Sequence, residues 1–197
     1  RSEIGETIQR EIDAGVGKKG QLLMKSIITQ LSDLTAGKDI IVSDVGQHQM
    51  ILARFYNFQT PNSWFTSGGA GTMGCALPMA VGVKLARPDE QVWAISGDGG
   101  FGQYAMELTT AVRYGMDITH VVLNDQELGK ISKEQRSAHL DVWQTRLVNP
   151  SFAAYAELCG ALGLRVERPD ELDDALGALM AHDGPALLEV VQDPRLV

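Results

Sequence analysis

Two short polar turns hold the carboxylates best placed to do chemistry in this sequence. The first covers 96–101 and reads Ser-Gly-Asp-Gly-Gly-Phe, and the second covers 124–129 and reads Asn-Asp-Gln-Glu-Leu-Gly. Asp125 lies 27 positions after Asp98, about the span of one strand–helix–strand unit. Carboxylate and main-chain oxygens suit Mg²⁺, and glycines at the start of a helix suit a diphosphate. The two turns therefore predict a site for a cation and a phosphate group together.

The elements around these turns would bring them together. The runs at 91–95 and 118–123 are short, apolar and β-branched, which is typical of buried parallel strands. Between them, 102–114 has apolar residues at helical spacing. Two parallel strands joined by a right-handed crossover end at the same edge of a sheet. We therefore expect the carboxylates of Asp98 and Asp125 to meet at that edge.

Each motif also has a simpler interpretation. A Gly-Asp-Gly turn alone is typical of a strand-to-helix connection with a capping aspartate, and only the second turn at the right distance favours a metal and phosphate site. The segment 45–50 reads Val-Gly-Gln-His-Gln-Met and follows another expected strand, so by itself it is a polar turn. The segment 67–74 reads Ser-Gly-Gly-Ala-Gly-Thr-Met-Gly, which by itself is a flexible glycine loop.

Strands and helices alternate along the rest of the chain. We expect strands at 39–43, 91–95, 118–123, 164–167 and 186–191, and helices at 21–34, 50–55, 74–86, 102–114, 128–136, 152–162 and 171–182, the last capped by Asp170. This order predicts an α/β fold: a doubly wound, mainly parallel sheet of about five or six strands with helices on both faces.

We expect one domain over residues 21–197. Residues 1–20 are polar and contain four glycines, which indicates a linker or the tail of a preceding domain, with a short helix at 6–12. The stretch 138–150 is long and irregular for a connection, which is typical of a functional loop. Because the chain begins with arginine rather than methionine, we expect it to be a piece of a longer protein.

Composition excludes several function classes. The net charge of −8 and the isoelectric point near 4.9 argue against binding to nucleic acid or to anionic membranes. No apolar run is long enough to span a membrane, and no signal peptide is visible. The two cysteines, Cys75 and Cys159, have no metal-binding spacing and fit small buried hydrophobes, so we expect a reducing, cytoplasmic location.

The spacing of these motifs resembles that of a known family. Gly97-Asp98-Gly99, followed after 24 residues by Asn124-Asp125, is similar to the diphosphate–Mg²⁺ motif of thiamine diphosphate enzymes, which usually ends in Asn-Asn. From about residue 40 onward the chain resembles one of that family's three domains, the C-terminal pyrophosphate-binding domain of the acetolactate synthase and pyruvate oxidase branch. The resemblance implies the thiamine diphosphate-binding fold with thiamine diphosphate and Mg²⁺ as cofactors, and it allows FAD in a domain not present here.

The resemblance also implies roles for residues near the cofactor rings and the diphosphate. Gln47 and His48 would donate hydrogen bonds to phosphate oxygens. Gly71 would offer its carbonyl to the aminopyrimidine amine. Met73 would wedge between the two rings and bend the cofactor, so that it can deprotonate itself, and an apolar, adaptable side chain suits that role. Gly71 and Met73 are therefore the expected catalytic residues.

The metal ligands follow from the same resemblance. Asp98 and Asp125 would give side-chain oxygens to Mg²⁺, and Glu127 would give its main-chain carbonyl. Asp125 departs from the family's usual asparagine and would add a negative charge beside the diphosphate. Leu128 would pack on the cofactor. The other cofactor-binding residues implied are Thr72, Gly97, Gly99, Gly100 and Gly129.

Part of the expected site is missing from this chain. The family takes its activating glutamate from the pyrimidine-binding domain of a partner subunit, and no residue here can be assigned that role. We therefore expect this chain to supply the diphosphate half of the site, to be inactive alone, and to work in a homodimer or homotetramer.

The expected function is thiamine diphosphate- and Mg²⁺-dependent decarboxylation or carboligation of a 2-oxo acid, with pyruvate as the expected substrate. This covers a lyase, a transferase or an oxidoreductase. Acetolactate synthases have a tryptophan where this chain, by count, has Glu134. The polar stretch 130–135 looks closer to pyruvate oxidase-like proteins, or is simply a solvated helix face.

Two alternatives remain open. The first is a non-catalytic domain kept for assembly or regulation, which Asp125 and the polar stretch 130–135 favour. The second is a flavin or nucleotide carrier of similar topology, which is disfavoured because a carboxylate pair at this spacing has no role there.

Overall fold

The strands form one parallel sheet in the computed structural model, which describes residue 7 and residues 22–193. The strand order is β2-β1-β3-β4-β6-β5, and all five pairings are parallel. The strands are β1 (Ile40–Ser43), β2 (Trp64–Phe65), β3 (Val92–Gly97), β4 (Ile118–Asn124), β5 (Leu162–Val166) and β6 (Ala186–Val191). The doubly wound α/β prediction is confirmed, whereas the expected linker at 1–20 and its short helix lie outside the described residues apart from Thr7.

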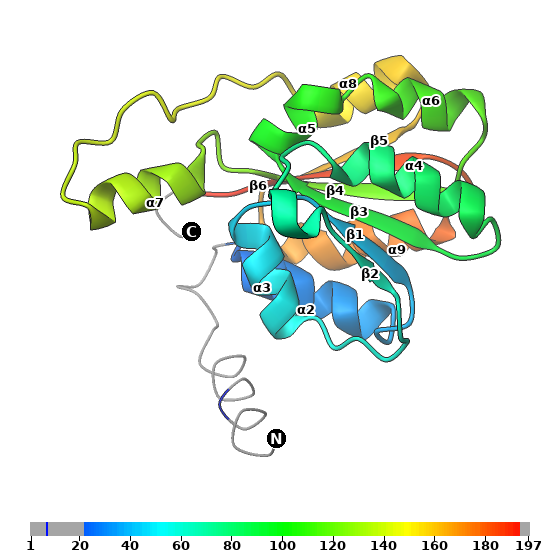
Figure 1. The fold of residues 1–197 in the computed structure, drawn as a ribbon. Helices are drawn as coiled ribbons and strands as arrows, with labels where there is room; N and C mark the ends of the chain where they lie inside the picture. The colour runs from blue at the N-terminus through cyan, green and yellow to red at the C-terminus, as the bar shows by residue number, and fades with distance from the viewer. Residues whose placement is uncertain (1–6, 8–21, 194–197) are drawn as a thin grey trace.

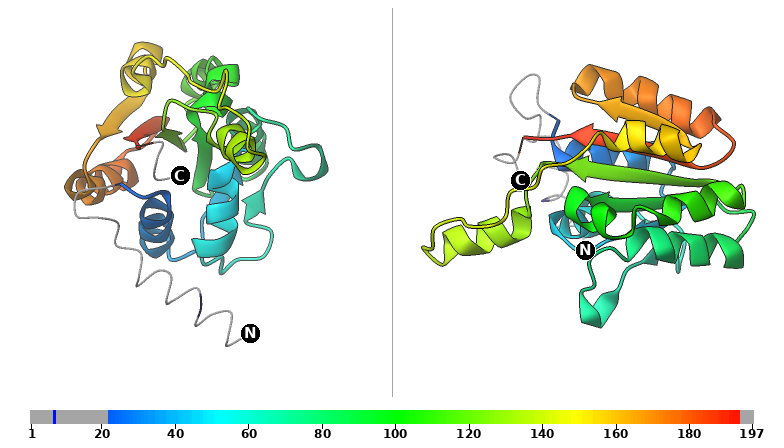
Figure 2. Two further views of the ribbon diagram at one scale, coloured as in Figure 1. Left: turned by 90° about the vertical axis from the view of Figure 1, so that its left-hand side faces the viewer. Right: turned by 90° about the horizontal axis from the view of Figure 1, so that it is seen from above.

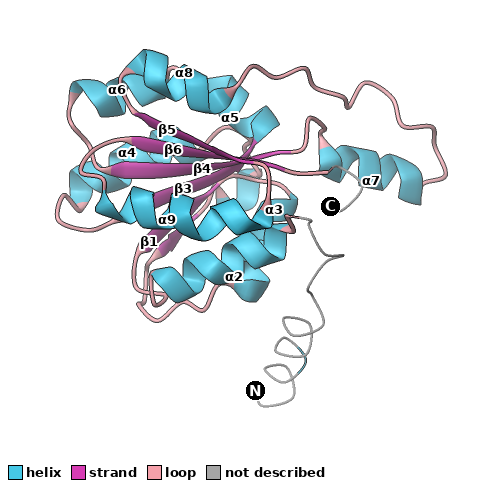
Figure 3. Ribbon diagram, turned by 180° about the vertical axis from the view of Figure 1, so that it is seen from behind, coloured by secondary structure: helices cyan, strands magenta, loops and turns pink. Residues whose placement is uncertain are grey.

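Helices cover both faces of the sheet. They are α2 (Met24–Leu34), α3 (Gln47–Phe55), α4 (Ala76–Ala86), α5 (Asp98–Tyr104), α6 (Glu107–Arg113), α7 (Gly129–Ser137), α8 (Phe152–Cys159) and α9 (Leu172–Ala181), with 3₁₀ turns η1 (Gly68–Ala70) and η2 (Pro169–Glu171). Figure 1 shows α4, α5, α6 and α8 on one face and α2, α3 and α9 on the other, and the view from behind shows α9 and α2 in front of the strands (Figure 3).

The central strands are buried because both of their faces are covered. All of β4 is buried, as is β3 apart from its last residue, and their near-continuous apolar runs are typical of strands inside a parallel sheet. On one face, Ile28, Leu52 and Leu176 pack with the strands, and on the other face Ala80, Leu108 and Ala156 do so. The carboxyl ends of β3 and β4 are therefore held in place by packing on both faces of the sheet.

The strand order determines where a ligand can bind. After β1 the chain enters α3 on one face of the sheet, and after β3 it enters α5 on the other face (Figure 1). In open parallel sheets, ligands bind where the chain leaves two neighbouring strands toward opposite faces, in the crevice beyond the carboxyl ends of those strands. The view from above shows α7 projecting beyond this edge of the sheet (Figure 2).

Several expected boundaries were wrong. The single helix expected at 102–114 is two helices: α5 starts directly at Asp98, and α6 starts after a turn at residues 105 and 106. At this interruption, Thr109 Oγ1 donates a hydrogen bond to the Met106 carbonyl at 2.7 Å. The polar turn expected at 44–49 already contains the first turn of α3. Asp170 does not cap α9; instead the Glu171 side chain accepts hydrogen bonds from the backbone N–H groups of residues 167 and 168.

Two further differences concern strands. The edge strand β2 was missed because two residues give no periodic pattern; it is held beside β1 by parallel pairing, and the Trp64 indole donates a 2.9 Å hydrogen bond to Ser43 Oγ. The helix expected at 152–162 ends at Cys159, because Gly160 adopts the left-handed conformation that closes helices. Strand β5 therefore starts at Leu162, two residues earlier than expected.

Within residue 7 and residues 22–193, no helix combines the length and the apolar character that crossing a membrane requires.

Candidate functional site

A cavity of about 270 Å³ opens at the carboxyl ends of β1, β3 and β4. Every predicted site residue except Thr72 lines it. These are Gln47, His48, Gly71, Met73, Gly97, Asp98, Gly99, Gly100, Asp125, Glu127, Leu128 and Gly129. Thr72 is exposed, and its backbone N–H donates to Ser67 Oγ at 2.9 Å. Sequence reasoning missed six lining residues: Met24, Val45, Gly46, Leu123, Lys130 and Ile131.

Asp98 is buried at the point where β3 becomes α5. Its Oδ1 accepts a hydrogen bond from its neighbour, the Gly99 backbone N–H, at 2.8 Å. Its Oδ2 accepts from the Gln126 backbone N–H at 2.8 Å and from Asn149 Nδ2 at 2.7 Å. Desolvation by burial raises the pKa of Asp98, and these hydrogen bonds oppose the rise. Three donors thus fix the orientation of this carboxylate.

Asp125 lies beside Asp98 at the end of β4. Burial, followed by the charge of Asp98, raises the pKa of Asp125 to about 7. A cation between the two carboxylates would offset both the desolvation of Asp125 and its repulsion by Asp98. The next residue, Gln126, has a left-handed backbone with φ of 58°, which is uncommon for a residue other than glycine and clusters at functional sites. The chain therefore turns sharply just after the second carboxylate.

One carboxylate oxygen of Glu127, Oε1, makes several contacts with protein groups. It accepts hydrogen bonds from Ser132 Oγ at 2.5 Å and from Thr145 Oγ1 at 3.5 Å, and it pairs with Arg136 at 3.3 Å. These contacts tie the residue to α7 and to the loop that follows that helix. They hold the side chain toward α7, and no hydrogen bond among the described residues uses the main-chain carbonyl of Glu127.

The loop after α7 returns through backbone hydrogen bonds to the turn at 124–129, which is here called the metal turn after the role that the sequence predicts for it. The Leu128 N–H donates to the Thr145 carbonyl at 2.7 Å, and the Leu147 N–H donates to the Gln126 carbonyl at 2.8 Å. Residues 129–144, here called the arm, therefore leave and re-enter the body of the domain at adjacent points. Figure 1 shows the arm standing away from the sheet.

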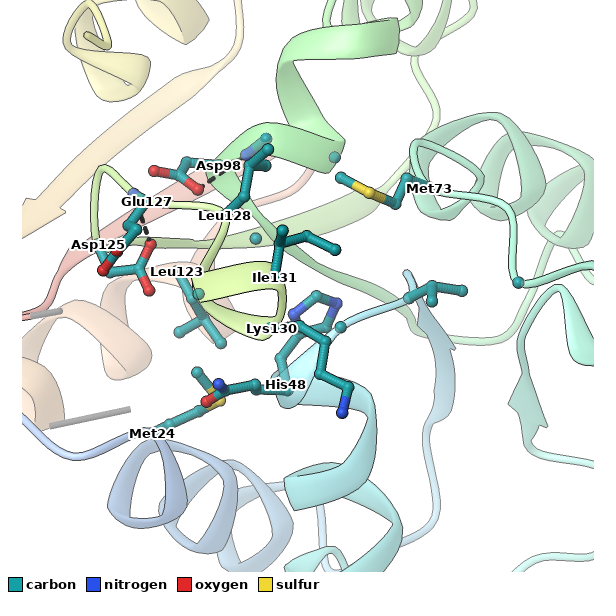
Figure 4. A pocket seen from close by; sticks show the side chains of 18 residues that line it. Met24, His48, Met73, Asp98, Leu123, Asp125, Glu127, Leu128, Lys130 and Ile131 are labelled. Atoms are coloured by element: carbon teal, nitrogen blue, oxygen red, sulfur yellow. Dashed lines mark hydrogen bonds between the residues drawn. The ribbon is translucent and has the colours of Figure 1, made fainter. Parts of the chain in front are cut away.

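The glycine-rich loop forms another wall of the cavity. Gly71 has a left-handed backbone with φ of 59°, and Met73 follows it. A Cβ atom added to Gly99 would lie 2.7 Å from Leu128 Cδ2 and 3.6 Å from Met73 Cε, so the space between these two apolar side chains depends on glycine. Figure 4 shows Met73 across the cavity from Asp98 and Asp125.

His48 lies in the first turn of α3 and is buried. Burial lowers the pKa of His48 to about 4, with a hydrogen bond to the backbone of Asp44 acting in the opposite sense. Its Nε2 has no hydrogen-bond partner among the described residues. Because an unpartnered buried polar atom costs about 1–3 kcal/mol, a ligand group that makes a hydrogen bond with this nitrogen would be stabilising.

Comparison with known proteins identifies the class. The family model described as thiamine pyrophosphate enzyme, C-terminal TPP binding domain, matches residues 44–190. The chain therefore belongs to the thiamine pyrophosphate enzymes and corresponds to their C-terminal TPP-binding domain.

Acetolactate synthases are among its curated relatives. The mitochondrial catalytic subunit of Aspergillus candidus is 38% identical over 183 residues, which cover 91% of this chain and 26% of that protein. The large subunit of Haemophilus influenzae is 38% identical over 161 residues, 80% of this chain and 28% of that protein. The isozyme 3 large subunit of Escherichia coli K12 is 38% identical over 177 residues, 88% of this chain and 29% of that protein. The chain thus spans less than a third of each of these relatives.

Proposed function

We propose that this chain supplies the diphosphate half of the active site in an enzyme that uses thiamine diphosphate and Mg²⁺ to decarboxylate a 2-oxo acid, with pyruvate as the substrate. The observation that carries the proposal is the pair of buried carboxylates, Asp98 and Asp125, on one side of a cavity whose other side holds Met73 (Figure 4). Two neighbouring carboxylates that are both buried repel each other when ionised, and a hard cation between them relieves that cost.

The oxygen atoms present fit Mg²⁺. In the described part of the chain, no group of three or more His, Cys, Asp and Glu side chains is arranged to hold a metal. Two carboxylates and one carbonyl form an incomplete shell, which suits Mg²⁺ because this ion keeps waters and takes ligand phosphates. Asp98, Asp125 and the Glu127 carbonyl would hold the ion.

The surroundings of the carboxylates fit a diphosphate. Gly97, Gly99 and Gly100 line the cavity, and without side chains they allow a ligand to approach the backbone closely. The buried Nε2 of His48 has no partner among the described residues. Because the other ring nitrogen makes a hydrogen bond with the Asp44 backbone, Nε2 would donate to a phosphate oxygen as part of an imidazolium, the form that the negative charge of a diphosphate favours. Gln47 on the same helical turn would supply a second donor.

Thiamine diphosphate, when bound, supplies the carbanion chemistry that removes carbon dioxide. The chain's own residues would supply geometry. The Gly71 carbonyl would accept from the aminopyrimidine amine, and Met73 would hold the two rings apart and bent. Leu128 would cover the rings, and Gly129 would let the metal turn approach them. Thr72 does not line the cavity, so it would contribute by setting the path of the loop between Gly71 and Met73.

Several parts of this proposal concern the longer protein. We infer that residues 21–197 are one domain of an enzyme whose pyrimidine-binding domain, in a partner subunit, supplies the activating glutamate. The assembly would be a homodimer or homotetramer, and any FAD would be bound by another domain. Sedimentation of the full-length protein combined with activity after dilution tests this, because a fully active monomer contradicts a site shared between subunits.

The reaction type is proposed from the relatives and from α7. The relatives named above are acetolactate synthases, which favours carboligation as the outcome of decarboxylation. On α7, Lys130 pairs with Glu134 across one helical turn, and both side chains are substantially exposed. That pair supports the interpretation of Lys130 and Glu134 as part of a solvated helix face, although Lys130 and Ile131 also line the cavity.

Calorimetry with thiamine diphosphate on the full-length protein, with and without Mg²⁺, tests the core of the proposal. We expect Mg²⁺-dependent binding in the natural protein and none in Asp98→Ala. The exposed Asp89→Ala serves as a matched control and should bind normally. Unchanged binding in Asp98→Ala contradicts the metal assignment. Binding without turnover of any 2-oxo acid would favour the non-catalytic alternative.

A further inference from the structure

A fully buried glutamate lies behind the metal turn, outside the cavity. Glu189 on β6 has no exposed surface. Its Oε1 accepts hydrogen bonds from Arg165 Nη1 at 2.6 Å and from Asn124 Nδ2 at 2.8 Å. Its Oε2 accepts from the Ala153 backbone N–H at 3.1 Å and from Ser151 Oγ at 3.3 Å. Four donors, one of them an arginine, therefore compensate its burial.

The contact with Asn124 begins a chain of hydrogen bonds toward the site. Since the Asn124 amide nitrogen donates to Glu189, its oxygen points to the other side and accepts from Asn149 Nδ2 at 3.0 Å. The same Asn149 nitrogen donates to Asp98 Oδ2 at 2.7 Å. The route from Glu189 to Asp98 thus has two links, both of them side-chain amides.

The two carboxylates determine which way both amides face. A carboxylate can only accept, so Glu189 requires the nitrogen of Asn124 to face it, and Asp98 requires the nitrogen of Asn149 to face it. The oxygen of Asn124 is then in place for the second hydrogen of Asn149. Reversing either amide would place an oxygen against a carboxylate. Asn149 is also the single side chain that donates to Asp98 among the described hydrogen bonds.

We propose that Asn149 is a positioning residue for the metal carboxylate Asp98 and that Glu189 acts on it through Asn124. This inference rests on the proposed function, because it assumes that Asp98 binds Mg²⁺. Glu189 orients the side-chain amide of Asn124, and Asn124 orients that of Asn149. Asn149 in turn keeps the Asp98 side chain in one rotamer. Affinity for Mg²⁺ then depends on a residue of β6 that does not touch the cavity.

The test measures how much Mg²⁺ the full-length protein needs to bind thiamine diphosphate. Asn149 is only partly buried, so Asn149→Ala should fold. We expect it to raise the half-saturating Mg²⁺ concentration at least tenfold. At saturating Mg²⁺, its affinity for thiamine diphosphate should return to within threefold of that of the natural protein. A half-saturating concentration within twofold of the natural value would overturn the inference.

Ser151→Ala provides the matched control. Ser151 donates to the same glutamate, but to its other oxygen, and it caps α8 by accepting from the Ala154 N–H at 3.2 Å. This variant should lower the melting temperature and leave the Mg²⁺ requirement unchanged. If Ser151→Ala raised the Mg²⁺ requirement as much as Asn149→Ala does, the effect would be general loosening and the positioning role would be wrong.

Glu189→Ala tests the relay at a distance. It removes the acceptor that orients the Asn124 amide nitrogen, so Asn124 can turn over and no longer fixes the orientation of Asn149. We expect a raised Mg²⁺ requirement in this variant, with no additional effect when Asn149→Ala is combined with it. Additive effects would show that the two residues act separately, which contradicts the relay. Failure of the natural protein to show Mg²⁺-dependent binding would instead remove the proposed function itself.

Discussion

The carboxylate of Asp44 accepts the backbone N–H of Gly74 at 2.9 Å from each of its oxygens, across 30 positions of sequence. Asp44 is buried at the end of β1 and also accepts from the Val45 N–H at 2.7 Å. A Cβ atom on Gly100 would lie 2.3 Å from its Oδ2. Asp44 therefore joins β1, the glycine-rich loop and the start of α5. Because Met73 directly precedes Gly74, the contact between Asp44 and Gly74 also positions Met73.

Asp44→Ala should be strongly destabilising. It leaves the buried Gly74 N–H without its partner, and a lost partner of this kind costs about 1–3 kcal/mol. Asp44→Asn keeps one oxygen in place and should cost less than about half as much. Urea unfolding of the two variants beside the natural protein measures the difference in the free energy of unfolding. Equal losses would show that charge, rather than hydrogen bonding, is what the site requires.

Asp125→Asn should be tolerated. The substitution removes a buried charge that faces Asp98 and restores the asparagine usual in the family. Without Mg²⁺ we expect a higher melting temperature at pH 8, because the repulsion and desolvation that raise the pKa of Asp125 disappear. With Mg²⁺, affinity for thiamine diphosphate should stay within about threefold or tighten. A loss beyond tenfold in calorimetry would mean that this protein depends on the second carboxylate.

Met73→Ala should reduce turnover more than binding. Met73 lines the cavity on the side away from the carboxylates, whereas most of the affinity would come from the metal and the diphosphate. We expect the rate of proton exchange at thiazolium C2, followed by NMR, to fall. The dissociation constant should change by less than about tenfold, or ~1.4 kcal/mol. Parallel losses in the two measurements would argue against a wedge.

His120 should make the fold sensitive to acid. It is buried on β4, its Nε2 contacts Ser96 Oγ at 2.8 Å, and burial, helped by His48, lowers its pKa to about 3. Because this value lies below the unfolded value of about 6.5, stability is complete above pH 6.5 and falls as the pH drops toward 3. Between pH 6.5 and 5 the expected loss is about 2 kcal/mol.

His120→Asn removes this titration. Its free energy of unfolding should therefore change about 2 kcal/mol less between pH 7.5 and 5 than that of the natural protein. The exposed His139→Asn is the matched control and should keep the natural pH dependence. If His120→Asn lost stability in acid as steeply as the natural protein, His120 would not be the group responsible.

The positions of Asp98 and Asp125 could be predicted from sequence because each follows a buried apolar run, and parallel topology brings such ends together. The same logic located His48 after β1. Asn149 could not be found this way, since its contact with Asp98 depends on the path of an irregular loop; the only signal was the length of the stretch 138–150. Asp44 was likewise hidden, because a carboxylate that accepts backbone hydrogen bonds has no sequence pattern of its own.

The backbone pairing at the base of the arm has an evolutionary consequence. The Leu128–Thr145 and Leu147–Gln126 hydrogen bonds bring the two ends of residues 129–144 within one strand spacing, roughly 5 Å. The entropic cost of closing a loop between two fixed ends rises only slowly with the length of the loop. The arm is therefore an exchangeable cassette: related enzymes could carry longer, shorter or differently charged versions of it, and diversify what reaches the cavity, while the acidic pair beneath stays where β3 and β4 put it.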